Sequence, residues 1–109
     1  MSIDLSGFHG TEQYYAHAFG RMVFTDGVRY FAEEAGALWF LDIVATEIIR
    51  LREAFIHIRL NVAERKAAAT ADDGNDRILW RKRIPFTDCP PGEYRFYLVD
   101  WVLLLPSEY

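Results

Sequence analysis

The sequence has few of the features that mark secreted, membrane-spanning or disulfide-bonded proteins. Its single cysteine, Cys89, cannot form a disulfide within the chain, which fits a reducing compartment. The longest apolar runs, such as the one at 102–106, are far too short to span a bilayer. The first residues have neither a basic start nor an apolar stretch, so we predict no secretory signal. We therefore expect a soluble cytoplasmic protein that makes no membrane contact.

The sequence also lacks the residue spacings typical of catalytic and metal centres. It contains no paired-histidine or Glu-x-x-His spacing, and the aspartate-rich segment 72–76 lacks the distal glutamate of a calcium loop. Cys89 stands beside two prolines with no nearby base, which is more typical of a structural thiol than of a nucleophile. Asp42 with His57 would be the pair for a hydrolase, on residue type alone. We expect no metal and no cofactor.

The composition indicates a packed globular protein. Of the 109 residues, 51% are hydrophobic and 16% are aromatic. A chain of this length buries about two-thirds of its unfolded surface and needs no disulfide or metal to stabilise it. We therefore predict a single domain over residues 1–109.

The longest helical pattern runs from Thr25 to Arg50. Apolar side chains recur there at spacings of three and four, the pattern of one buried helix face. Thr25 or Asp26 would cap this helix, and Gly36 predicts a kink near its middle. The alternative is a hairpin turn at 25–27 followed by an extended segment and a later helix; we favour the helix.

A shorter helix is predicted before this segment and strands after it. The short helix would begin at Thr11 and stop near Gly20, and residues 21–24 would be extended. Alternating apolar and polar residues then predict strands, with turns at 72–75 and 100–101. These strands are expected at 55–62, 66–71, 77–86, 94–99 and 102–105. The predicted fold is α+β, with N-terminal helices, one of them long, packed on one face of a mostly antiparallel sheet of four to five strands.

The charges are divided unevenly along the chain. Residues 1–48 carry seven acidic and two basic side chains, a net −5, whereas residues 50–83 carry nine basic and five acidic ones, a net +4. Strand alternation places four of the nine basic ones, together with His57, Arg95 and Tyr97, on one solvent-facing side of the sheet. This face could bind phosphates and stack a base, or meet an acidic protein surface; the alternative is an ordinary solvated face with local ion pairs. The predicted binding residues are His57, Arg59, Arg77, Arg81, Arg83, Arg95 and Tyr97.

Aromatic residues suggest a second contact surface. The middle of the long helix is apolar on more than one face, so Trp39 and Phe40, with Trp101, are candidate interface residues. Asp42 interrupts this apolar stretch, and a buried carboxylate there would need a partner such as Arg29 or a tyrosine hydroxyl.

Three segments resemble an uncharacterised bacterial domain family that also occurs on phages, plasmids and other mobile elements. They are GTEQYY at 10–15, FTDGVRYFAEEAGALWFLDIVA at 24–45, and IPFTD at 84–88 leading to YLVDWVLLLPSEY at 97–109. The resemblance implies a small single-domain protein of bacterial or phage genomes, without an assigned activity or cofactor. Trp101 departs from it, because a glycine is expected at that position of the last hairpin.

Taken together, these features favour a small non-catalytic binding or regulatory protein. It would act through protein–protein contact, with a protein partner or with itself as a homodimer, for instance as an inhibitor of a host system. The alternative is a nucleic-acid-binding module that uses the basic sheet face. The third hypothesis is a small hydrolase-type enzyme.

Overall fold

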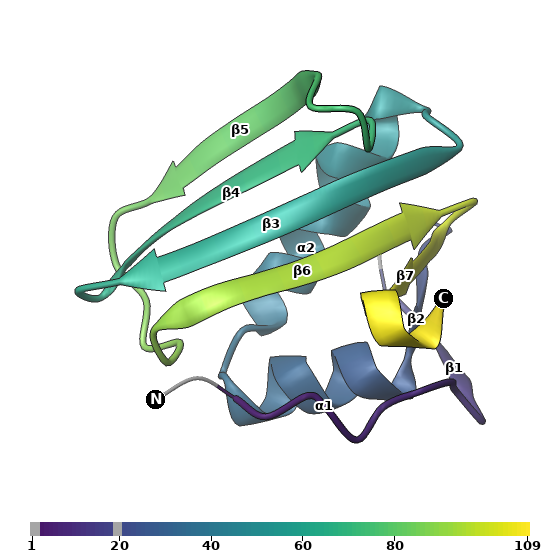
Figure 1. The fold of residues 1–109 in the computed structure, drawn as a ribbon, viewed down its shortest axis with the longest axis horizontal. Coiled ribbons are helices and arrows are strands. Elements are labelled where there is room, and N and C mark those ends of the chain that lie inside the picture. The colour runs from purple at the N-terminus through teal and green to yellow at the C-terminus, as the bar shows by residue number, and fades with distance from the viewer. Residues whose placement is uncertain (1–2, 19–20) are drawn as a thin grey trace.

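A computed structural model describes residues 3–18 and 21–109 and has an α+β fold (Figure 1). The α+β class predicted from the sequence is therefore confirmed. In chain order the elements are β1 (Tyr14–Ala16), β2 (Val23–Thr25), α1 (Asp26–Glu34), α2 (Leu38–Thr46), the 3-10 helix η1 (Ile48–Leu51), β3 (Phe55–Ala63), β4 (Lys66–Asp72), β5 (Ile78–Ile84), β6 (Gly92–Val99), β7 (Val102–Leu104) and the 3-10 helix η2 (Pro106–Glu108).

The strands of the described part form one seven-stranded sheet in the order β1-β2-β7-β6-β3-β4-β5. All neighbouring strands are antiparallel except β2 and β7, which are parallel. The predicted four to five strands correspond to β3–β7. The prediction was too low because β1 and β2, which precede the helices in the chain, extend the sheet at one edge.

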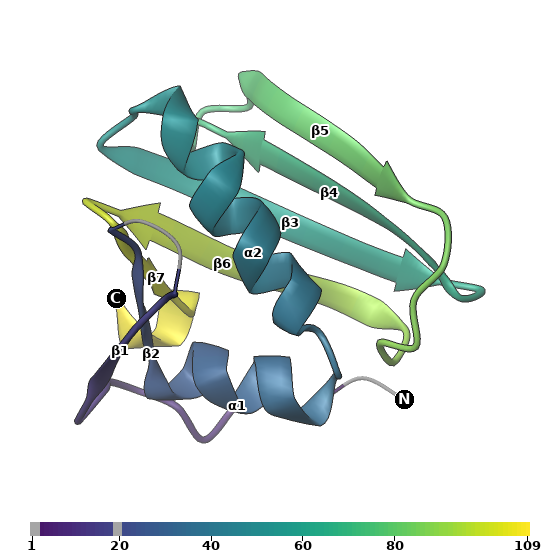
Figure 2. The same ribbon diagram turned by 180° about the vertical axis from the view of Figure 1, so that it is seen from behind.

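The two faces of the sheet have different surroundings. Figure 2, which shows the molecule from the side opposite to Figure 1, shows α2 lying across one face of the sheet. Helix α1 lies next to α2, at the edge of the sheet. In the described part no α-helix covers the opposite face, and only η2 lies on it, against β6 (Figure 1). We call this opposite face the open face.

Three phenylalanines join the helices to the sheet. Phe31 of α1, Phe40 of α2 and Phe96 of β6 are each fully buried. Their ring centroids are 4.8 Å apart for Phe40 and Phe96, and 5.1 Å apart for Phe31 and Phe96. Aromatic pairs at such distances contribute about 0.5–1.5 kcal/mol each beyond the area they bury. The core therefore lies between the helices and the covered face.

The predicted long helix is two helices, α1 and α2. Helix α1 begins after Thr25, whose hydroxyl accepts a hydrogen bond from the Val28 N–H at 3.4 Å, so residues 28–31 are helical as favoured. It ends before Gly36, which has φ +62°, a conformation that glycine adopts without steric cost. The predicted kink is therefore a complete break.

No helix of the described residues is both long and apolar enough to cross a membrane.

The predicted helix that starts at Thr11 is not formed. Tyr14–Ala16 is strand β1 and pairs with β2, because β2 presents it with a free edge. The Thr11 hydroxyl donates to the Gln13 carbonyl at 2.6 Å and accepts from the Asp26 N–H at 3.0 Å, so it binds the first N–H group of α1 and does not cap a helix of its own. The predicted end near Gly20 lies outside the described residues.

A bulge changes the expected faces of β5. Trp80 pairs with Ala71 but Ile78 pairs with Asp72, so Leu79 is the extra residue. Ile78 consequently pairs with Asp72 and is 45% exposed, whereas simple alternation along β5 would place it on the same face as Trp80 and Ile84. Phe86 lies beyond the strand end and is 60% exposed.

The side-chain carboxylate of Glu108, in η2, joins the last residues to the start of α1. Its Oε1 accepts from the Thr25 hydroxyl at 2.6 Å and the Leu105 N–H at 3.0 Å, and its Oε2 accepts from the Gly27 N–H at 3.1 Å. A negative charge is favourable at a helix N-terminus. A Cβ at position 27 would lie 2.5 Å from the Leu105 Cδ1, so this close approach requires glycine.

Replacing Glu108 with alanine should lower the free energy of unfolding by about 2–4 kcal/mol, because three donors lose a charged acceptor. Urea denaturation measures the change. Glu34→Ala, an exposed carboxylate at the other end of α1, should change it by less than about 0.5 kcal/mol. Equal losses in the two variants would show that Glu108 does not hold the tail in place.

Candidate functional site

The strand register of the open face aligns side chains in rows across β5, β4, β3 and β6. Residues paired across neighbouring strands point to the same face, and strands lie about 4.8 Å apart. The central row contains three arginines. The rows are Arg83, Ala68, Asn61 and Glu93; Arg81, Thr70, Arg59 and Arg95; and Ile78, Asp72, His57 and Tyr97.

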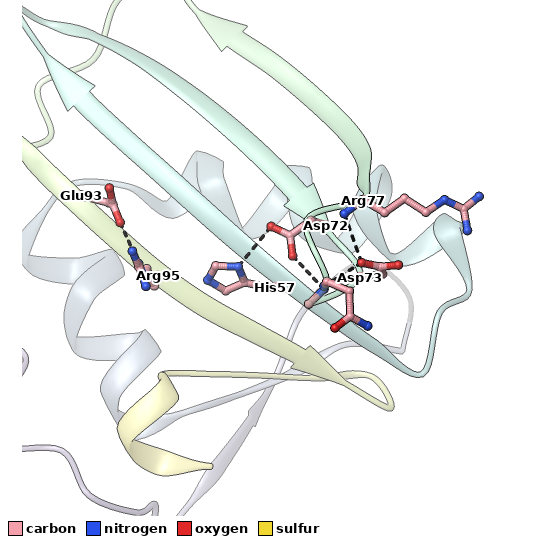
Figure 3. A network of polar contacts seen from close by, with 8 residues as sticks. His57, Asp72, Asp73, Arg77, Glu93 and Arg95 are labelled. Carbon is pink, nitrogen blue, oxygen red and sulfur yellow. Dashed lines mark hydrogen bonds and ion pairs between the residues drawn. The ribbon is translucent and has the colours of Figure 1, made fainter.

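Six of the seven residues predicted for a basic face therefore lie together on the open face, and Arg77 does not. Arg77 precedes β5 in the turn, and its side chain extends away from His57 (Figure 3). Simple alternation places Arg77 with Arg81, but the bulge at Leu79 shifts the register between them. Whether this face binds a partner stays a prediction.

His57 and Asp72 form a hydrogen-bonded pair at the centre of the third row (Figure 3). The His57 Nδ1 lies 3.2 Å from Asp72 Oδ2, and Asp72 Oδ1 accepts from the Gly74 N–H at 2.8 Å. Both side chains are largely buried, with 13% and 8% exposed. A carboxylate at Nδ1 favours the tautomer with its proton there, which leaves Nε2 as an acceptor in the neutral ring.

The aspartate-rich segment is a hairpin connection. The Asp73 Oδ1 accepts from the Asn75 N–H at 2.8 Å and from the Arg77 N–H at 3.3 Å (Figure 3). Such side-chain bonds to the following backbone are typical of aspartate turns. Over residues 3–18 and 21–109, no three His, Cys, Asp or Glu side chains gather as a metal site would require.

A polar hollow of about 250 Å³ lies over these residues, between the third row and the end of the central row. Arg95 forms one side of it and donates from Nε to Glu93 Oε1 at 2.7 Å. This hydrogen bond is the main cause that lowers the pKa of Glu93, and the charges of Arg95, Arg59 and His57 lower it further. The local potential is therefore positive enough to favour a carboxylate in its ionised form.

Among the described residues, three arginines of the open face have no carboxylate partner. Arg59, Arg81 and Arg83 form no ion pair with any residue that the structure describes, whereas Arg95 pairs with Glu93. The Arg59 Nε is buried and has no hydrogen-bond partner in that part of the chain. A buried donor without an acceptor costs about 1–3 kcal/mol. The alternative of arginines neutralised by local carboxylates therefore fits Arg95 only.

Aromatic side chains border the arginines at the β7 side. The Tyr97 ring lies 4.9 Å from the Phe55 ring and 5.5 Å from the Tyr109 ring, measured between centroids. Tyr109 is 73% exposed, but it covers part of Tyr97. Tyr97 therefore anchors the C-terminus to the open face and does not present a free ring surface.

The three candidate interface residues have different surroundings. Phe40 is fully buried in the core, so it is not accessible to a partner, and Trp39 is partly buried against the same core. Trp101 is 44% exposed, and the Arg21 guanidinium carbon lies 5.5 Å from its ring centroid. Of these three candidates, only Trp101 has a large part of its side chain exposed to solvent.

The backbone of Trp101 is strained. Asp100 and Trp101 have φ of +46° and +76°, the left-handed turn in which glycine is usual at the second position. For a residue other than glycine this conformation costs about 1–3 kcal/mol. The turn geometry expected for glycine is therefore present, although tryptophan occupies it.

Asp42 and His57 do not form the pair considered for a hydrolase. Asp42 lies on α2, on the covered side of the sheet, and its Oδ1 is 2.8 Å from His17 Nε2. Its side chain is 54% exposed, so Asp42 is not a buried carboxylate. Arg29, considered as its partner, instead lies 3.5 Å from Glu33.

Asp72 is the residue of this site that sequence reasoning missed. Glu64 and Arg65, which both have positive φ, form the turn between β3 and β4. Asp72 follows this turn by as many residues as His57 precedes it, so the two residues pair across the strands. A two-residue hairpin of that type sets the register of β3 and β4. Recognising this turn would have paired the two side chains, but neither Glu nor Arg is a usual residue for it.

The fold and the open face together define a small α+β protein with an uncovered, arginine-bearing sheet surface. The whole chain, residues 1–109, matches the family model described as "Family of unknown function (DUF6876)", and the chain belongs to this family. No curated protein and no solved structure matches the chain.

Asp72→Ala should lower the free energy of unfolding by about 1–3 kcal/mol, because the Gly74 N–H loses its acceptor and the His57 ring loses its partner. Urea denaturation and the ring-nitrogen NMR shifts of His57 measure the two effects. Asp76→Asn, at an exposed position that asparagine tolerates at φ +67°, is the control. A stability loss without any change at His57 would contradict the pairing.

Cys89 should react slowly with iodoacetamide in the native protein. The thiol is only 4% exposed, and burial raises its pKa, so the reactive thiolate is scarcer at pH 8 than in free cysteine. Mass spectrometry should show the alkylation rate rise severalfold on unfolding in guanidinium. Equal rates in the native and unfolded protein would overturn this.

Proposed function

We propose that this chain is a small binding protein that acts through contact with another protein, with the open face as its contact surface. The observation that carries the proposal is that Arg59, Arg81 and Arg83 share a face that no α-helix covers and have no carboxylate partner among the described residues. Such guanidinium groups can pair with a partner's carboxylates without first breaking ion pairs of their own.

Arg59 is the centre of this surface. It lies between Thr70 and Arg95 in the central row, and its Nε is buried without an acceptor among the described residues. An arginine fixed in this way loses little side-chain entropy on binding. It has the properties of an interface hot spot, a class in which arginine and tyrosine are enriched.

The chemistry of the open face favours a partner with an acidic surface. Its outer strand β5 carries Arg81 and Arg83 two residues apart, about 7 Å along the strand. Opposite charges across an interface accelerate association and set the orientation of the partners. A second copy of this chain is an alternative partner, because residues 1–48 carry a net charge of −5 and residues 50–83 a net charge of +4.

The sequence resemblance suggests a setting for this function. We propose that the protein acts in the cytoplasm of bacteria, as a product of a bacterial or mobile-element genome, and that binding to a host protein inhibits a host system. The arginines of the open face support the proposal that the protein binds a partner. Inhibition of that partner is a further step of the proposal.

Arg81→Glu with Arg83→Glu should abolish capture of the partner. The tagged protein, expressed in the bacterium that encodes it, is purified with its bound proteins, and the affinity for the captured protein is then measured by calorimetry. We expect the double variant to bind at least tenfold more weakly, about 1.4 kcal/mol. Both side chains are exposed, so the melting temperature should be nearly unchanged.

The matched control is Arg29→Glu, a charge reversal on α1 away from the open face. It should retain the partner. Sedimentation velocity of the pure protein tests the second copy as partner. A protein captured equally by wild type and by the double variant would contradict the open face as contact surface, as would a stable monomer that captures no protein in stoichiometric amount.

Nucleic acid is the second candidate partner, favoured by the row of Arg81, Arg59 and Arg95, since arginine rows bind phosphates. The Tyr97 ring, which would stack a base, is partly covered by Tyr109. Binding of single- or double-stranded DNA or RNA that weakens steeply with salt and fails in the double variant would establish this alternative.

A further inference from the structure

A second hollow lies on the helix-covered side of the sheet, at the C-terminal end of α2 and at η1, and is separate from the open face. Its volume is about 630 Å³, within the range of sites that bind small molecules. Apolar side chains form its floor, contributed by Ala45, Ile49, Ile56 and Leu98. The floor can therefore bury the flat face of a small ligand.

Trp101 forms one wall of this hollow. Its strained backbone is fixed on both sides: the Asp100 N–H donates to the Ala54 carbonyl at 3.3 Å, and the Trp101 carbonyl accepts from the Val23 N–H at 2.9 Å. The turn closes β6 onto β7, and glycine would form it at a lower cost than tryptophan. The indole remains 44% exposed, so neither the turn nor burial accounts for a tryptophan at this position. An indole held rigidly at a hollow is a stacking surface for another ring.

Three arginines, Arg21, Arg50 and Arg52, also line the hollow. None of them forms an ion pair in the described part of the chain, although Glu53 and Asp100 are also part of the lining. The lining thus has an excess of one positive charge, carried by groups that donate hydrogen bonds in pairs. Guanidinium groups bind the oxygens of phosphate in this way.

We propose that this hollow binds a small planar heterocycle that carries a phosphate group, the chemistry of a mononucleotide. The ring lies on the apolar floor beside Trp101, and the phosphate is held by the arginines. Arg21 lies over the Trp101 ring, so it links the stacking surface to the anion-binding groups. This site does not depend on the function proposed for the open face, because the two share no residue.

Calorimetric titration at low salt tests the proposal with three probes. AMP carries both the ring and the phosphate, adenosine carries the ring alone, and inorganic phosphate carries the anion alone. We expect AMP to bind one per chain, and each of the other two to bind at least tenfold more weakly. Equal binding of inorganic phosphate and AMP, or no binding of AMP, would overturn the proposal.

Two variants separate this role from a structural one. Trp101→Gly removes the stacking surface and relieves the backbone strain, so AMP binding should fall at least tenfold with little loss in melting temperature. Arg50→Gln removes one donor group and should also weaken AMP binding severalfold. Arg83→Gln, the same change on the open face, should leave AMP binding unaltered. AMP affinity that is unchanged in Trp101→Gly would exclude this site as the place of binding.

Discussion

The carboxylate of Glu108 is the contact on which the arrangement of the sheet depends. It brings the end of the chain to the start of α1, where Thr25 and Gly27 bind it. This contact keeps β7 beside β2, the parallel pair that joins the N-terminal strands to the rest of the sheet. It also directs Tyr109 onto the open face, against Tyr97. The segments at 24–45 and 97–109, which carry the family resemblance, are thus in direct contact.

The sheet separates two surfaces that have different chemistry. The open face presents arginines in register on rigid strands, with few apolar groups between them, which suits charge pairing with a large partner. The hollow on the covered side combines an apolar floor with Trp101 and three arginines, which suits a small ligand. Because the sheet lies between the hollow and the open face and the two share no residue, we expect a substitution in one surface to leave the packing of the other intact.

Local patterns predicted those parts of the fold in which one strand or helix determines its own side-chain directions. The alternation in 55–62 placed His57 and Arg59 on the open face, and Thr25 was one of two predicted caps of α1. The failures were non-local. Residues 14–16 became a strand because β2 offers an edge, and the bulge opposite Asp72 shifted the register of β5. Neither pairing leaves a periodic signal in the sequence.

The candidate sites coincide with positions where a local rule is broken. Arg59 keeps a buried nitrogen without an acceptor, and Trp101 occupies a turn conformation that favours glycine. The Arg59 nitrogen costs stability in the free protein, and no contact within the described residues offsets that cost. The turn at Asp100 and Trp101 closes β6 onto β7, as the turn at Glu64 and Arg65 closes β3 onto β4, so both strained turns have a structural role. Glycine would form the β6–β7 turn at a lower cost, however, so the turn does not account for a tryptophan at this position, and its exposed indole at the hollow is the group that a ligand can contact.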